Sequence, residues 1–182
     1  MRILTLNLNG IRAAARKGFF DWVHTQHIDI LCLQEVRAQS AQLAPFQQLT
    51  GYQAYFSEAE KKGYSGVAIY SRYTPERIVN RLDWAVADQE GRYIQLDFPN
   101  WSVVSLYLPS GTSGHARQQC KFQFLEYYGN VLKMQRQQAR EFILCGDWNI
   151  AHRPIDLKKL AGQSKTFRFF ARRACMVRLC IR

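Results

Sequence analysis

Short apolar runs of strand length alternate along this chain with longer segments in which apolar residues recur every three or four positions. The strand-like runs lie at 2–8, 28–34, 53–56, 66–71, 77–82, 93–98, 101–108 and 142–145. The helical spacing covers 10–27, 39–49 and 116–140 and predicts helices there. Strands that follow one another in mid-chain, flanked by helices, predict an α/β protein with a mixed sheet rather than an all-parallel one.

The composition is that of a single folded domain. The chain has 182 residues, of which 47% are hydrophobic, enough for a packed core. Its apolar runs are far shorter than the roughly 20 residues that cross a bilayer. Met1 leads directly into a strand-like pattern, without the apolar core of a signal peptide. We therefore expect a soluble cytoplasmic protein that makes no membrane contact and acts as a monomer.

The cysteines and the charge narrow the function classes only a little. The five cysteines form no Cys-x-x-Cys pair, so reduced structural thiols are expected and a zinc site is not. The net charge is +11, but residues 160–182 carry six of the 25 basic residues and no acidic one. The remaining +5 on residues 1–159 fits a nucleic-acid partner without requiring one.

Polar side chains stand where three of the apolar runs end. Asn7 and Asn9 follow the first run, Glu35 follows the second, and Asp147 and Asn149 follow the last. Alone, an Asn or a Gly-Asp pair after a strand is typical of a turn, and a Glu in that position is usually solvated. Together they are more informative, because side chains from separate strand ends converge in α/β folds. Carboxylate and amide oxygens without Cys or His suit a hard cation such as Mg²⁺ or Mn²⁺.

Five motifs in order resemble exonuclease III, a member of the endonuclease/exonuclease/phosphatase superfamily. They are Leu6-Asn7-Leu8-Asn9-Gly10-Ile11-Arg12, Leu33-Gln34-Glu35, Gly66-Val67-Ala68-Ile69, Leu106-Tyr107-Leu108-Pro109-Ser110-Gly111 and Gly146-Asp147-Trp148-Asn149-Ile150-Ala151. The resemblance covers residues 1–159. It implies part of a four-layer αββα sandwich of the DNase I-like type. It also implies a magnesium-dependent hydrolase of DNA repair, a 3′→5′ exodeoxyribonuclease and abasic-site endonuclease that acts on double-stranded DNA at abasic sites and 3′ ends.

The same resemblance implies roles for individual residues. Asn7, Glu35, Asp147 and Asn149 would form the metal site, with Glu35 as the principal carboxylate. Asp147 would orient and deprotonate the attacking water, Asn149 would bond a phosphate oxygen, and Tyr107 would lie near the scissile phosphate.

Two basic residues are similar to phosphate contacts of the family, namely Arg92 and Lys121. Contacts of this kind position a DNA strand without reading its sequence. A phosphatase of the same superfamily is an alternative, which the first and fourth motifs disfavour. A non-catalytic DNA-binding module, keeping Arg92, Lys121 and the basic tail, is a second alternative.

The chain departs from the family beyond Lys159. The family's C-terminal half, with its further aspartates and catalytic histidine, has no counterpart among residues 160–182. Codons exist for which another reading frame of this stretch spells the family's own continuation. We therefore hypothesise a frameshift near Lys159 that truncates the enzyme and leaves its activity open. The alternative is a basic tail of this lineage that binds DNA.

Overall fold

A computed structural model describes residues 1–111 and 114–150. The segment 160–182, for which the frameshift is hypothesised, lies outside the described residues. The chain divides into two units, residues 1–108 with 139–148, and residues 109–138 with 149–182, and each is described by itself. Among the described residues, no helix has the length and apolar character that a membrane crossing requires.

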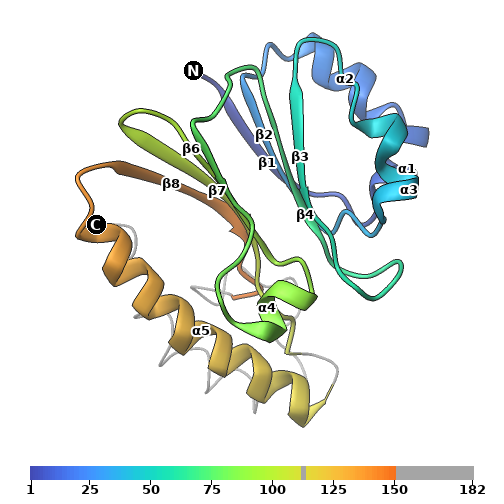
Figure 1. Ribbon diagram of the computed structural model, residues 1–182. Coiled ribbons are helices and arrows are strands. Elements are labelled where there is room, and N and C mark those ends of the chain that lie inside the picture. Colours follow the sequence, from blue (N-terminus) through green and yellow to red (C-terminus); the bar gives the residue numbers. More distant parts are fainter. Residues whose placement is uncertain (112–113, 151–182) are drawn as a thin grey trace. The chain divides into compact units, whose positions relative to one another are not determined.

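Most of the helices and all of the strands in the described residues belong to the first unit, and one long helix is described in the second. Figure 1 shows these elements. The strands are β1 (Ile3–Asn7), β2 (Ile30–Gln34), β3 (Gln53–Ser57), β4 (Val67–Ser71), β5 (Arg77–Val79), β6 (Tyr93–Asp97), β7 (Trp101–Tyr107) and β8 (Glu141–Asp147). The helices are α1 (Ile11–Arg16), α2 (Phe19–Thr25), α3 (Ser40–Leu43) with a 3₁₀ turn (Ala44–Phe46), and α4 (Ala85–Gln89). Helix α5 (His115–Arg136) belongs to the second unit.

The strands of the described residues form two four-stranded sheets, in the orders β1-β2-β4-β3 and β5-β6-β7-β8. Two pairs are parallel, β1 with β2 and β7 with β8, and the others are antiparallel. The prediction of a mixed α/β fold is therefore confirmed. In both parallel pairs the carboxyl ends of the strands lie side by side, which brings four strand ends to one region of the unit.

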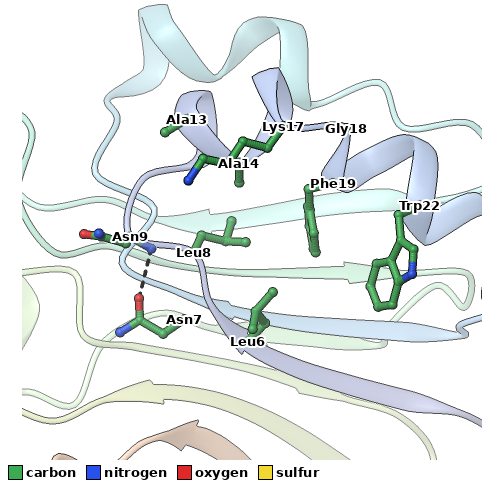
Figure 2. Close-up of a pocket in the computed structure, with 10 residues that line it drawn as sticks. All are labelled: Leu6, Asn7, Leu8, Asn9, Ala13, Ala14, Lys17, Gly18, Phe19 and Trp22. Atoms are coloured by element: carbon green, nitrogen blue, oxygen red, sulfur yellow. Dashed lines mark hydrogen bonds between the residues drawn. The ribbon is translucent and has the colours of Figure 1, made fainter.

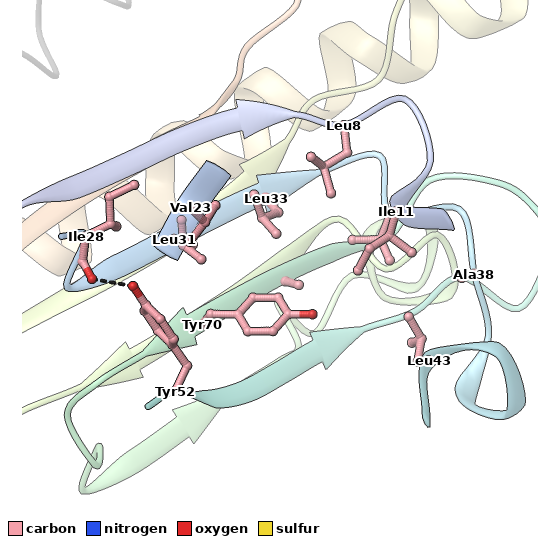
Figure 3. Packing of buried hydrophobic residues seen from close by; sticks show 12 residues of the cluster. Leu8, Ile11, Val23, Ile28, Leu31, Leu33, Ala38, Leu43, Tyr52 and Tyr70 are labelled. Atoms are coloured by element: carbon pink, nitrogen blue, oxygen red, sulfur yellow. Dashed lines mark hydrogen bonds between the residues drawn. The ribbon is translucent and has the colours of Figure 1, made fainter. Parts of the chain in front are cut away.

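Two apolar clusters hold this unit together. The first lies between the β1–β4 sheet and helices α1, α2 and α3, with Ile11, Val23 and Leu43 from the helices against Leu31 and Tyr70 of the sheet (Figure 3). The second fills the space between the two sheets, with residues such as Cys32, Val67, Ile94 and Val103. Burying a side chain of this size stabilises the fold by about 1.5–3 kcal/mol. Helices, sheet and second sheet thus form three layers of the first unit.

The layer between the sheets changes character along the strands. At one end it is apolar, with Ile30 of β2 and Val103 of β7. In the middle it holds small or polar side chains: Ser105 donates a hydrogen bond of 3.1 Å to the carbonyl of Leu33, and Gln34 donates one of 3.0 Å to Ser105. At the far end stand the polar groups of the candidate site. The sheets therefore pack tightly in the middle and open onto a polar end.

Two elements differ from the sequence-based expectation. The helix expected over 10–27 is interrupted at Gly18, whose φ of 78° lies in the left-handed region and separates α1 from α2. Glycine adopts this conformation without steric cost, which explains the break. Helix α4 was missed, because Ala85–Gln89 is too short to show a helical period.

Candidate active site

The amide of Asn7 joins two carboxylates that are far apart in the sequence. Its Nδ2 donates hydrogen bonds of 2.8 Å to Glu35 and of 2.8 Å to Asp147. Asn7 and Asp147 end strands β1 and β8, and Glu35 directly follows β2, so the three residues meet where the two sheets end. The backbone N–H of Asn9 donates to Asn7 Oδ1 at 2.9 Å and fixes the orientation of the amide. The sequence-based grouping of Asn7, Glu35 and Asp147 is therefore reproduced in space.

Glu35 interacts with several neighbouring side chains. Burial raises the pKa of the Glu35 carboxyl. Hydrogen bonds from Asn7 and the Tyr107 hydroxyl, together with the positive charge of Arg37, lower it by more. The net effect is a pKa below the ordinary value of a glutamate. Arg37 also forms an ion pair with Glu35 Oε2. Burial, followed by the bond to Glu35 and its charge, raises the pKa of Tyr107 to about 12. At neutral pH the site therefore holds a carboxylate beside a protonated phenol.

The backbone around Glu35 is strained and firmly braced. Glu35 and Arg37 both have φ of 51°, in the left-handed region that residues with a Cβ seldom adopt. The carbonyl of Glu35 accepts from Gly10 at 2.8 Å, and the N–H of Arg37 donates to the carbonyl of Ser65 at 2.8 Å. Such strain costs about 1–3 kcal/mol per residue and persists only where the surroundings hold it. It aims the Glu35 side chain at the end of β1.

Gly146 allows strand β8 to place Asp147. A Cβ added at Gly146 would lie 2.3 Å from the carbonyl oxygen of Leu106 on β7, a distance that no real side chain tolerates. Only glycine lets the two strands approach in this register, in which Tyr107 and Asp147 are opposite each other.

Arg92 lies inside the unit, at the carboxyl end of β7. Its side chain is only 1% exposed and pairs with Glu90 at 2.6 Å. It also donates to the carbonyl of Tyr107 at 2.9 Å and to the Tyr64 hydroxyl at 3.0 Å, and its guanidinium lies 4.7 Å from the centre of the Tyr107 ring. In this conformation Arg92 positions Tyr107. A direct phosphate contact by Arg92 stays a prediction.

The other expected residues lie in the second unit. Lys121 of α5 is buried, and its ammonium donates a hydrogen bond to the backbone carbonyl of Asn149. Asn149 itself has φ of 49°, in the left-handed region. The structure thus brings Lys121 and Asn149 together, and the roles expected for them on a phosphate stay predictions.

Three arginines were not singled out from the sequence. Arg12, Arg16 and Arg37 line a hollow of about 350 Å³ together with Asn9 and Gly63. Arg12 and Arg16 are four residues apart in α1 and therefore share a face of the helix. The available signals were that Arg12 ends the first motif, that Arg16 follows it by four residues, and that Arg37 follows Glu35 by two. This concentration of positive charge adjoins the acidic site.

A second hollow of about 490 Å³ is lined by Asn7 and Asn9 together with residues of α1 and α2 (Figure 2). Leu6, Phe19 and Trp22 give it an apolar wall, and Asn7 and Asn9 form its polar end. Leu6 and Trp22 are 41% and 46% exposed, which is high for such large apolar side chains. Within the described part of the sheet, β1 is also one of the two edge strands.

The donor set fits a hard divalent cation. Among residues 1–111 and 114–150 there is no cluster of three or more His, Cys, Asp and Glu side chains. Glu35 and Asp147 supply two carboxylates, and both accept a hydrogen bond from the side-chain amide of Asn7. Mg²⁺ commonly binds one or two carboxylates and keeps several waters, so this smaller set suffices.

The two face-to-face sheets, with paired carboxylates at the shared strand ends, define the class of DNase I-like α/β proteins. A sequence model of the Endonuclease/Exonuclease/phosphatase family matches residues 4–176, and the chain belongs to this family. It is 37% identical over 159 residues to a *Bacillus subtilis* protein named exodeoxyribonuclease, and 34% identical over 176 residues to the *Danio rerio* DNA repair nuclease APEX1. The catalytic domain of *Xenopus laevis* APE2 has the same fold, with a TM-score of 0.79 and 26% identity over 95% of this chain and 67% of that one.

The chain spans only part of these relatives. The alignments cover 87% and 93% of this chain but 62% of the *Bacillus* protein and 55% of the zebrafish protein. The activities of the whole relatives are therefore carried over only as proposals.

The lowered pKa of Glu35 predicts a pH-dependent contribution to stability. Folding lowers the pKa of this carboxyl, so its ionised form stabilises the folded state. The contribution is fully present above the ordinary pKa of 4.5. It is lost as the pH falls through the lower pKa of the folded state. We expect the unfolding free energies of the wild type and Glu35→Gln, measured in urea, to differ most at neutral pH and to converge below pH 4.5. Glu60→Gln is the control, because Glu60 is exposed and the change removes the same charge. A difference between wild type and Glu35→Gln that is constant with pH would contradict the assignment.

Proposed function

We propose that this chain provides the metal and water-activating site of a magnesium-dependent DNA phosphodiester hydrolase of the exonuclease III type. Its substrates would be double-stranded DNA at abasic sites and 3′ ends. The observation that carries the proposal is the single amide of Asn7, which holds Glu35 and Asp147 at the shared strand ends. The names of relatives, exodeoxyribonuclease and DNA repair nuclease, support the choice of DNA as the substrate.

The residues divide the chemistry between them. Glu35, with Asn7, Asp147 and Asn149, would hold a Mg²⁺ or Mn²⁺ ion. When bound, the cation withdraws charge from the phosphoryl oxygens as a Lewis acid. Asp147 would accept a proton from the attacking water, because it carries a carboxylate at the strand end that faces the other polar groups. The Tyr107 hydroxyl, kept protonated by its raised pKa, would donate to a phosphate oxygen once released from Glu35.

The arginine-lined hollow supports a strand of nucleic acid. Arg12, Arg16 and Arg37 line it, and Arg37 also pairs with Glu35. A DNA backbone that presents its scissile phosphate to the site would continue along these arginines. Contacts of this kind neutralise phosphates and make binding strongly dependent on salt concentration. The same observation supports the second candidate function, a non-catalytic DNA-binding module.

Removal of the divalent ion separates the two candidate functions. We expect the full chain to incise a duplex carrying one abasic site in Mg²⁺, and to lose incision in EDTA while it still binds the duplex. Binding should survive EDTA because the arginines of the hollow can contact phosphates without a divalent cation. Incision would be followed on denaturing gels and binding by fluorescence anisotropy. Binding without incision in Mg²⁺ would reject the hydrolase in favour of the binding module, and incision in EDTA would reject the metal site.

A further inference from the structure

Two cysteines occupy the middle of the layer between the sheets. Cys32 is the central residue of β2 and is fully buried in the second apolar cluster, and Cys145 of β8 packs against the same cluster. The two thiols share a hydrogen bond across the gap between the sheets. In the described residues both are free thiols.

The surroundings show why the two strands come close at this point. In register, Cys145 is opposite Ser105 on β7, whose hydroxyl bonds the backbone of Leu33, the residue next to Cys32. Small side chains at this level allow the sheets to approach, and Cα atoms of β2 and β8 come within 8 Å of each other. A disulfide requires Cα atoms about 4.4–6.8 Å apart, and the hydrogen bond between the two thiols brings their sulfur atoms to face each other across this gap.

We propose that Cys32 and Cys145 form a reversible disulfide that ties the two sheets together under peroxide. The half-buried Cys145 is the thiol that hydrogen peroxide reaches. Its sulfur attacks one peroxide oxygen, the O–O bond breaks, and a sulfenic acid and water result. The sulfur of Cys32 then attacks the Cys145 sulfur, expels a second water and closes the S–S bond. Overall, two thiols are oxidised and one peroxide is reduced to two waters. A dithiol returns the pair to the reduced state.

The location gives the bond a consequence for the site. Cys32 lies three residues before Glu35 on the same strand, and Cys145 lies two residues before Asp147. A covalent link at this level fixes the separation of the two strands that carry the carboxylates. The disulfide itself does not depend on the proposed hydrolase activity, so it is tested without it.

The experiment isolates the pair. In the full chain, Cys120, Cys175 and Cys180 are replaced by Ser, so that Cys32 and Cys145 are the remaining thiols. After treatment with hydrogen peroxide, we expect both thiols to become unreactive toward a thiol reagent in denaturant. The mass of the chain should fall by two hydrogen atoms, one cross-linked peptide pair should appear after proteolysis, and a dithiol should reverse these changes.

Two further variants make the outcome decisive. Cys32→Ala and Cys145→Ala are made separately in the same background, and each keeps a small apolar side chain at the changed position. After peroxide treatment, each variant should contain one thiol that is either reactive or oxidised on its own, and no cross-link. The proposal is overturned if the two-thiol protein gains oxygen atoms instead of losing hydrogen, if both thiols stay reactive, or if the cross-link joins two chains. Far-UV circular dichroism before oxidation verifies that the background variant is folded.

Discussion

Replacing Asp147 by Asn is expected to lower the rate of abasic-site incision by about 10²–10⁴-fold, the range typical of a lost general base. The amide oxygen of the new Asn can still accept the hydrogen bond of 2.8 Å that Asn7 now donates to Asp147 Oδ2. The site therefore keeps its geometry but loses a proton acceptor and a negative charge. Incision would be measured under single-turnover conditions in Mg²⁺, so that product release does not limit the rate.

Asp21→Asn is the matched control, because Asp21 is an exposed residue of α2 and the change removes the same charge. It should incise at the wild-type rate. Equal loss in both variants would assign the effect to overall charge, and full activity of Asp147→Asn would remove Asp147 from the chemistry. Duplex binding should be close to wild type in both variants.

Replacing Arg92 by Met is expected to destabilise the fold by about 3–5 kcal/mol, the cost of breaking a buried ion pair by removing one partner. The guanidinium that now pairs with Glu90 and bonds the carbonyl of Tyr107 would be lost. Met fills part of the volume but removes the positive charge that pairs with Glu90. Urea denaturation monitored by tryptophan fluorescence measures the change, and Arg77→Met on the exposed face of β5 should leave the stability close to that of the wild type.

A second readout distinguishes positioning from stability alone. Because Arg92 lies 4.7 Å from the Tyr107 ring, its loss should also slow incision at temperatures at which the variant remains folded. Arg92→Lys keeps the charge but not the forked geometry, and should recover part of the stability and less of the activity. Wild-type incision by a folded Arg92→Met protein would show that Arg92 serves the fold only.

The alternation of apolar runs was sufficient to predict the strands and the mixed sheet, because buried strands leave a direct trace in hydrophobicity. The grouping of Asn7, Glu35 and Asp147 was also predictable, since each ends an apolar run. The left-handed backbone of Glu35 was not, because it depends on bonds to Gly10 and other residues distant in the sequence.

The environment of Arg92 could not be predicted for a related reason. A basic residue between Gly91 and Tyr93 has the local pattern of a surface contact. Its burial follows from tertiary structure, because Glu90, Tyr64 and the carbonyl of Tyr107 surround the guanidinium and satisfy it. Arg37 was overlooked because a single arginine after a strand has no pattern of its own, and its ion pair with Glu35 appears only in space.

The division of the site between two sheets has a consequence for the order of folding. The described strands of one sheet lie within residues 3–71 and those of the other within residues 77–147, so each set can pair from its own segment of chain. The bond from Asn7 to Asp147 spans 140 positions and exists only after the sheets have docked. Contacts between such distant residues form late, since the entropy of closing a long loop must be overcome first. The acidic centre is therefore among the last features to assemble in refolding. It should also be among the first to fail in mild denaturant, while most of the strands are still paired.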